Sequence, residues 1–139
     1  MGGWKPGCAA LALVAGLLPV ASGCSACRST ELSASPVQVT DPEAPLELEA
    51  RLTRDGAPFP GRRLAFLSSA RDARGESTGM VLGYGETGAD GVARVVFRRG
   101  LAGMALPSQQ VVGYRVQFET LGEVDGDLYC DSETEAVLR

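Results

Sequence analysis

The feature that most limits the fold is a set of short runs in which apolar and polar residues alternate. In the clearest run, 46–52, four apolar residues alternate with three charged ones. A period of two places successive side chains on opposite faces of a strand, so it predicts strands with one buried and one solvent-exposed face. The same pattern recurs, with interruptions, in segments 37–39, 64–66, 80–84, 92–97, 114–119 and 134–138. No 12-residue stretch after residue 35 keeps a helical apolar stripe, and the chain therefore predicts an all-β domain.

Turn-forming residues separate these runs. Asp55-Gly56 and Asp90-Gly91 are strong turn dipeptides, because glycine accepts a positive φ without steric cost. Pro58, Pro60 and Gly61 exclude a helix between the runs that they separate. About seven short strands in roughly 100 residues are typical of a β-sandwich.

Three segments carry a resemblance to a known family. Segments 48–66 and 85–97 resemble the strand–turn–strand units of bacterial immunoglobulin-like (Ig-like) repeats, and 126–132 is similar to the segment before their last strand. The resemblance implies an immunoglobulin-like β-sandwich over residues 36–139. Modules of this family serve as spacers, adhesin segments and appendages of larger enzymes, so the resemblance implies a fold more than an activity.

Residues 1–23 have the layout of a signal peptide. Lys5 supplies a positive charge, and the apolar run 9–18 is followed by small residues. This run is shorter than the 20 or so residues that a membrane-spanning helix needs. The alternative is a buried core helix, which the glycines, proline and charge around the run disfavour.

The end of this leader resembles the lipobox of bacterial lipoproteins. Ala21-Ser22-Gly23-Cys24 matches it, although Ala21 stands where the family usually has leucine. The resemblance implies that the thiol of Cys24 is acylated, and that the mature chain is anchored to the cell envelope. Ser25, in place of aspartate, resembles the outer-membrane sorting signal of cells with two membranes. The alternative is cleavage after Ser22 or Gly23, which would give a secreted protein.

The remaining chain is divided into a tether and a domain. Residues 24–35 are small and polar and predict a lipid-anchored tether before the domain at 36–139. In the resembled sandwich the first and last strands commonly lie side by side, which favours a Cys27–Cys130 disulfide in an oxidising compartment. Two alternatives stay open. Cys130 is a buried free thiol, with Cys27 bonded to Cys24 or to nothing, or Cys24-x-x-Cys27 is a redox or metal motif.

Charge and composition argue against several classes of function. From Cys24 onward the chain has 12 arginines against 17 acidic residues, a net charge of −5, which argues against nucleic acid as a partner. The chain has no histidine, so the commonest hydrolase and general-base designs are excluded. No phosphate-binding loop or dinucleotide motif is present. We therefore expect no catalytic residue, no cofactor and no metal.

Four groups of residues are candidates for binding. Leu101, Met104 and Leu106 are apolar residues in an expected loop, which either contacts a partner or folds over the open end of the sandwich. The acidic cluster Asp125–Glu133 is either a calcium site or a solvated turn. The pairs Arg62-Arg63 and Arg98-Arg99 either bind an acidic glycan or protect strand edges. For stacking on sugars, the chain after the leader offers three tyrosines and no tryptophan: Tyr84, Tyr114 and Tyr129.

These observations together predict a non-enzymatic, surface-anchored interaction or structural module. Its expected partners are the membrane, through the lipid anchor, and a protein or glycan. The alternative is an accessory or ligand-binding subunit of an extracytoplasmic enzyme or transporter.

Overall fold

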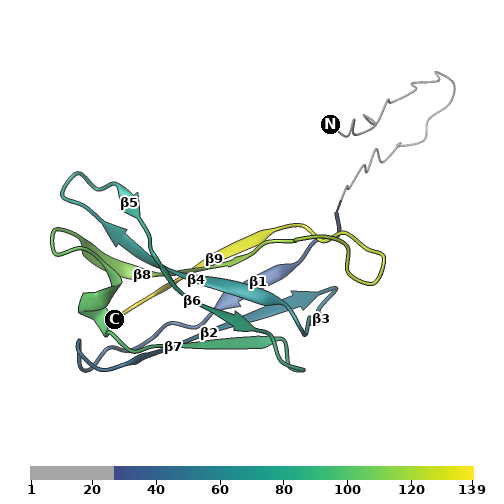
Figure 1. Ribbon diagram of the computed structural model, residues 1–139, viewed down its shortest axis with the longest axis horizontal. Coiled ribbons are helices and arrows are strands. Elements are labelled where there is room, and N and C mark those ends of the chain that lie inside the picture. The colour runs from purple at the N-terminus through teal and green to yellow at the C-terminus, as the bar shows by residue number, and fades with distance from the viewer. Residues whose placement is uncertain (1–26) are drawn as a thin grey trace, which may run out of the picture.

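Two antiparallel sheets pack face to face in the computed structural model, which describes residues 27–139 (Figure 1). The first sheet contains β1 (Glu31–Ala34), β2 (Leu46–Arg54), β3 (Ala57–Pro58) and β7 (Val92–Phe97). The second contains β4 (Arg63–Arg71), β5 (Ser77–Thr78), β6 (Val81–Glu86), β8 (Gln110–Phe118) and β9 (Ser132–Val137). The predicted all-β sandwich is confirmed. Six of the seven expected strands correspond to β2, β4, β6, β7, β8 and β9. The strand expected at 37–39 is not formed, β1 was not expected, and β3 and β5 are short additions.

One helical turn, η1 (Leu101–Met104), interrupts the strands of the described region. Within residues 27–139, no helix is both long and apolar enough to span a membrane. The predicted signal peptide, 1–23, and Cys24 lie outside the described residues.

Each sheet is built around one long central strand. In the first sheet β2 pairs with β1 along one edge and with β7 and β3 along the other. In the second sheet β4 lies between β8 and the pair β5 and β6, while β9 follows β8. The predicted turn at Asp55-Gly56 joins β2 to β3, and both residues have positive φ, 50° and 76°, as a tight two-residue hairpin requires.

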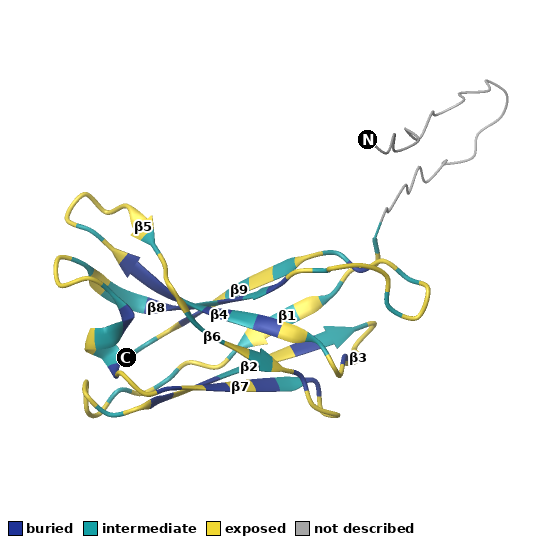
Figure 2. Cartoon of the chain, viewed as in Figure 1, coloured by how far each residue is buried: buried dark blue, intermediate teal, exposed yellow. Residues whose placement is uncertain are grey.

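The alternating pattern explains which face of each strand is buried. In β2, Leu46, Leu48, Ala50 and Leu52 are buried, whereas the charged residues between them face outward. Figure 2 shows the resulting alternation of buried and exposed positions along the strands. The inward residues of both sheets form one continuous core, which also contains Phe59, Phe66, Phe97, Tyr114, Val116 and Phe118.

The sheets approach closely where β6 faces β7, and two glycines make this possible. Gly83 and Gly85 both lie inside β6. A Cβ atom at Gly83 would lie 2.9 Å from Cγ1 of Val95, and one at Gly85 would lie 3.0 Å from the carbonyl oxygen of Arg94. Since both distances are below ordinary carbon contacts, larger residues would push the sheets apart.

Tyr114 joins the sheets across the core. Its hydroxyl donates to the carbonyl oxygen of Ser35, just after β1, and lies 3.1 Å from that of Glu49 in β2. The side chain itself belongs to β8 and is buried. Removal from water disfavours the phenolate, so burial raises the pKa of Tyr114 above its ordinary value.

The first strand begins earlier than the sequence indicated. β1, at Glu31–Ala34, lies inside the expected tether 24–35, and Leu32 and Ala34 pack against the core. The expectation missed this strand because only two alternating apolar residues mark it among small polar ones. Further along, Val37 forms a parallel bridge with Leu138. The first and last segments therefore lie side by side, as expected.

Candidate interaction surfaces

One end of the sandwich is closed by the bridge between Cys27 and Cys130, and we call this end the disulfide pole. The two Cα atoms are 5.0 Å apart, and the predicted disulfide is confirmed. Arg28 forms a parallel bridge with Tyr129, its amide donating to the carbonyl of Leu128 at 2.7 Å. The amide of Cys130 donates in turn to the carbonyl of Arg28 at 2.7 Å. The chain therefore enters the sandwich at a fixed point.

Arginines stack on aromatic rings beside the bridge. The guanidinium of Arg54 lies 4.3 Å from the centroid of the Phe59 ring and donates to the hydroxyl of Tyr129 at 2.9 Å. Arg28 forms ion pairs with Asp55 and Asp127. Its hydrogen bond to Asp127, with the nearby charge of Asp55, raises the pKa of Arg28. This network occupies charges that would otherwise be free for a ligand.

The acidic cluster Asp125–Glu133 is divided among partners of the protein itself. Asp127 accepts from Arg28 at 2.8 Å, and Asp125 lies 4.0 Å from Arg54. Asp131 accepts the amide of Thr120, and Glu133 lies 3.7 Å from Arg115. Across residues 27–139, no three acidic or cysteine side chains converge in a way that would hold a metal ion. These contacts fit a structured turn and give calcium no preformed cage.

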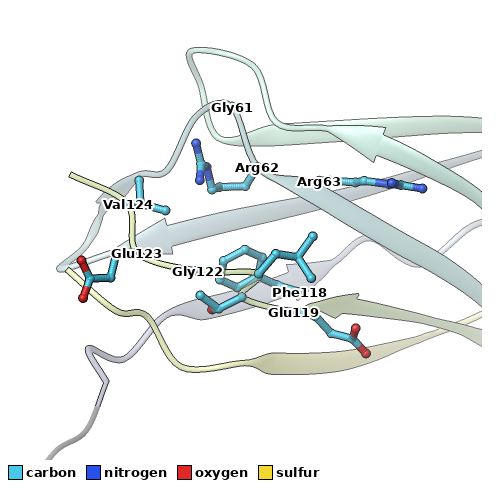
Figure 3. A pocket seen from close by; sticks show the side chains of 10 residues that line it. Gly61, Arg62, Arg63, Phe118, Glu119, Gly122, Glu123 and Val124 are labelled. Atoms are coloured by element: carbon cyan, nitrogen blue, oxygen red, sulfur yellow. The ribbon is translucent and has the colours of Figure 1, made fainter. Parts of the chain in front are cut away.

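A hollow of about 340 Å³ lies next to this network, between the start of β4 and the loop after β8. Figure 3 shows Arg62 and Arg63 on the strand side of the hollow and Glu119 and Glu123 on the loop side. Phe118, which is buried, contributes to its lining. Charges of both signs therefore meet around a small apolar floor.

The arginine pairs differ in their surroundings. Arg62 lies over the ring of Phe59, 5.3 Å from its centroid, and Arg63 covers that of Tyr84 at 3.9 Å. Arg98 and Arg99 follow β7 and are exposed. The pair at residues 62–63, for which a glycan site and edge protection were the two alternatives, thus forms arginine–aromatic stacks.

The tyrosines do not form a sugar-binding platform. Tyr114 and Tyr129 are buried in the core. Tyr84 is 53% exposed, but Arg63 lies over its ring. Stacking on a sugar needs a free aromatic face, and Arg63 already occupies one face of this most exposed tyrosine.

The opposite end of the sandwich, which we call the apolar pole, carries the predicted binding loop. Leu101 packs partly against the core, and Leu106 is 66% exposed. Met104 is wholly buried, so it offers no exposed side chain for binding, although it lines one of the hollows at this end. It fills the open end of the core because η1 turns its side chain inward. Part of the loop therefore folds over the open end of the core, as one of the two alternatives predicted, and part of it faces solvent.

Two hollows flank Leu106. One, of about 560 Å³, is lined by Leu101, Ala105, Leu106 and Pro42, among others. The other, of about 340 Å³, includes Met80 and shares Ala105 and Leu106 with the first. Sequence reasoning missed Met80 and Pro42 because they come from distant turns that only the fold brings to this end.

Hydrogen bonds hold the apolar loop in place. The amide of Leu101 donates to the carbonyl of Pro42 at 2.7 Å. The side chain of Gln109 accepts from the amide of Leu106 at 3.1 Å. Because the backbone is fixed at both ends, Leu106 is presented as an ordered ridge between the two hollows.

Comparisons with known proteins find a likeness in structure that is distant in sequence. No family model matches the chain, and no curated protein matches it. Among solved structures, the chain is similar to the crystal structure of MtrC from Shewanella baltica OS185. The identity is 15% and the TM-score 0.45, and the likeness covers 76% of this chain and 21% of that one.

Proposed function

We propose that this protein is an exported, lipid-anchored Ig-like module without enzymatic activity, which presents its apolar pole to a protein partner. The observation that carries the proposal is the arrangement of the two ends. The described chain begins at the disulfide pole, and the helical turn η1 lies at the opposite end of the sandwich (Figure 1). The exposed Leu106 follows this turn closely in the sequence.

The disulfide supports export. Such bridges persist in oxidising compartments and are rare in the cytosol. Cys27 and Cys130 form a disulfide with each other. If the leader, which contains Cys8, is removed, Cys24 is then left without another cysteine to pair with. Acylation gives that remaining thiol a role, and it agrees with the lipobox-like residues 21–24. The cell envelope is then the location, and the outer membrane where a cell has two.

The chemistry of the apolar pole favours a protein partner over a glycan. Leucine, methionine, alanine and proline side chains line the hollows beside Leu106. Apolar hollows around an exposed leucine fit an apolar side chain of a partner, whereas sugars need flat aromatic faces and convergent polar groups. A partner that is an extracytoplasmic enzyme or transporter would make this chain its accessory subunit.

Anchoring is tested by cell fractionation of the wild type and Cys24→Ala. We expect the wild type in the membrane fraction with an acylated N-terminus, because acyl chains hold a protein at a bilayer. The variant should be released or remain unprocessed. A wild type that is mostly soluble, with an unmodified N-terminus, would contradict the proposal.

Partner binding is tested by site-specific photo-crosslinking in intact cells. A photoreactive residue at 106 should give one discrete adduct. The same residue at 96 is the matched control, because Val96 is comparably exposed, at 54%, but lies on β7. Leu106→Asp should abolish capture of the partner from solubilised envelope, while Val96→Asp should not. Identical adducts from both positions, or capture that Leu106→Asp leaves intact, would count against the apolar pole.

A further inference from the structure

We propose that the loop of residues 119–128, at the disulfide pole, rests on the bilayer that holds the lipid anchor, with Leu121 and Leu128 in contact with the lipid interface. This inference rests on the proposed acylation of Cys24. It adds a second membrane contact, made by the folded domain, and it fixes which end of the sandwich faces the membrane.

The first step is the short distance between the anchor and the domain. Only two residues separate Cys24 from Cys27. An extended chain covers at most about 3.6 Å per residue, so Cys27 stays within roughly 11 Å of the acylated residue. Cys27 is bonded to Cys130. The disulfide pole is therefore held close to the membrane surface, and the domain cannot move away on a long tether.

The second step places the loop beside that bridge. The carbonyl of Leu128 accepts the amide of Arg28 at 2.7 Å. At the other end of the loop, the hydroxyl of Thr120 donates to the carbonyl of Tyr129 at 2.5 Å. The amide of Thr120 donates to the carboxylate of Asp131 at 2.7 Å. Both ends of the loop are thus fixed next to Cys130. Figure 1 shows the loop at the end of the sandwich where the described chain begins.

The third step is the exposure of the loop's apolar side chains. Leu121 is 91% exposed, and Leu128 is 42% exposed. A leucine at a loop tip gains little from the core beneath it, but it gains free energy when it enters the interfacial region of a bilayer. We favour the membrane over a second protein as the partner of this loop, because the short tether keeps the membrane close to the loop at all times.

Charge defines which lipid surface fits. Asp127 and Asp125 lie against Arg28 and Arg54, whereas Glu123, also exposed, has no ion pair among the described residues. The loop is therefore acidic overall and suits a zwitterionic surface better than an anionic one. The contact that we infer is apolar, and phosphatidylcholine vesicles are the appropriate probe.

The experiment uses tryptophan fluorescence in the full, processed lipoprotein. From Cys24 onward the chain contains no tryptophan, so Leu121→Trp introduces a single fluorophore. Leu106→Trp is the matched control, since it is also an exposed leucine on a loop but lies at the apolar pole. Each variant is reconstituted into phosphatidylcholine vesicles with and without lipids brominated close to the headgroup.

We expect brominated lipid to quench the emission of Leu121→Trp, because interfacial side chains lie ~5–10 Å deep and so come close to the bromine atoms. The emission of Leu106→Trp should not change. Equal quenching of the two variants, or none in either, would overturn the inference.

Flotation of the vesicles and intact mass separate this inference from the proposed function. Protein that is acylated and floats, but whose residue 121 is not quenched, leaves the anchor intact and refutes the loop contact alone. Protein that is not acylated and does not float refutes both. The mass also verifies that Trp4 has been removed with the leader. Because residue 121 is exposed, its replacement should leave the fold unchanged, and circular dichroism of both variants checks this.

Discussion

Replacing Tyr114 with phenylalanine tests how the two sheets are held together. The substitution removes one hydroxyl and leaves the buried ring in place. The carbonyl of Glu49 also accepts the amide of Ser35 at 3.1 Å, so it keeps a partner. The carbonyl of Ser35 loses the hydroxyl that it accepts in the native protein.

The expected cost follows from these contacts. Ser35 is exposed, so water can reach its carbonyl, and the loss is that of an ordinary hydrogen bond. Such a bond contributes about 0.5–1.5 kcal/mol, and we therefore expect Tyr114→Phe to lower the free energy of unfolding by about 1 kcal/mol. Tyr84→Phe is the control. Tyr84 is 53% exposed, and a surface change of this kind should alter stability by less than about 0.5 kcal/mol.

The raised pKa of Tyr114 adds a pH dependence with a definite sign. Below about pH 10, the ordinary tyrosine pKa, the hydroxyl is protonated in both the folded and unfolded states. Above it, the unfolded state loses the proton while the native state keeps it, because burial raises the native pKa. The unfolded state then binds fewer protons, so wild-type stability falls as pH rises, by at most about 1.4 kcal/mol per pH unit.

The assay is urea unfolding of the wild type and both variants between pH 8 and pH 11. Lysines titrate in the same pH range as tyrosines. The one lysine, Lys5, lies in the leader, so a processed chain has no lysine to complicate the titration. The stability gap between wild type and Tyr114→Phe should be largest at pH 8 and shrink above pH 10. A gap that stays constant with pH, or a variant as stable as the wild type, would refute the reasoning.

Two further changes test other parts of the fold. Cys27→Ser with Cys130→Ser should lower the free energy of unfolding by at most about 4–5 kcal/mol, because the bridge closes a loop of 103 residues in sequence; an unchanged urea midpoint would contradict this. Gly83→Ala should cost about 1–3 kcal/mol by crowding Val95. Adding Val95→Ala should recover part of that loss, and fully additive effects in thermal unfolding would show that the two positions are not in contact.

The strands were predictable because a half-buried sheet imposes a period of two on its sequence. β2 is the clearest example, since its four inward residues are all apolar and the residues between them are charged. β1 was not predicted because it is short and only Leu32 and Ala34 in it pack against the core. A strand this short is formed mainly by its neighbours, and its own pattern carries little information.

The candidate sites were less predictable than the fold, because they depend on packing between distant segments. The sequence alone does not show whether an apolar loop residue is buried or faces solvent. Met104 is buried against the core, whereas Leu106 faces solvent. The stacking of Arg54 on Phe59 and of Arg63 on Tyr84 likewise depends on register and turns. The disulfide was predictable because the first and last segments of such a sandwich lie together.

The position of the bridge also decides how the protein responds to mechanical load. In the proposed arrangement, a pull between an anchor at Cys24 and a partner at Leu106 would pass from Cys27 directly into Cys130. Even if every strand came apart, the shorter arm of the covalent ring, about 24 residues from Leu106 to Cys130, would stop extension at roughly 85 Å. The longer arm, which holds β1 to β7, would remain slack. Under sustained tension the module would therefore extend only to this limit, and it could refold when the force is released.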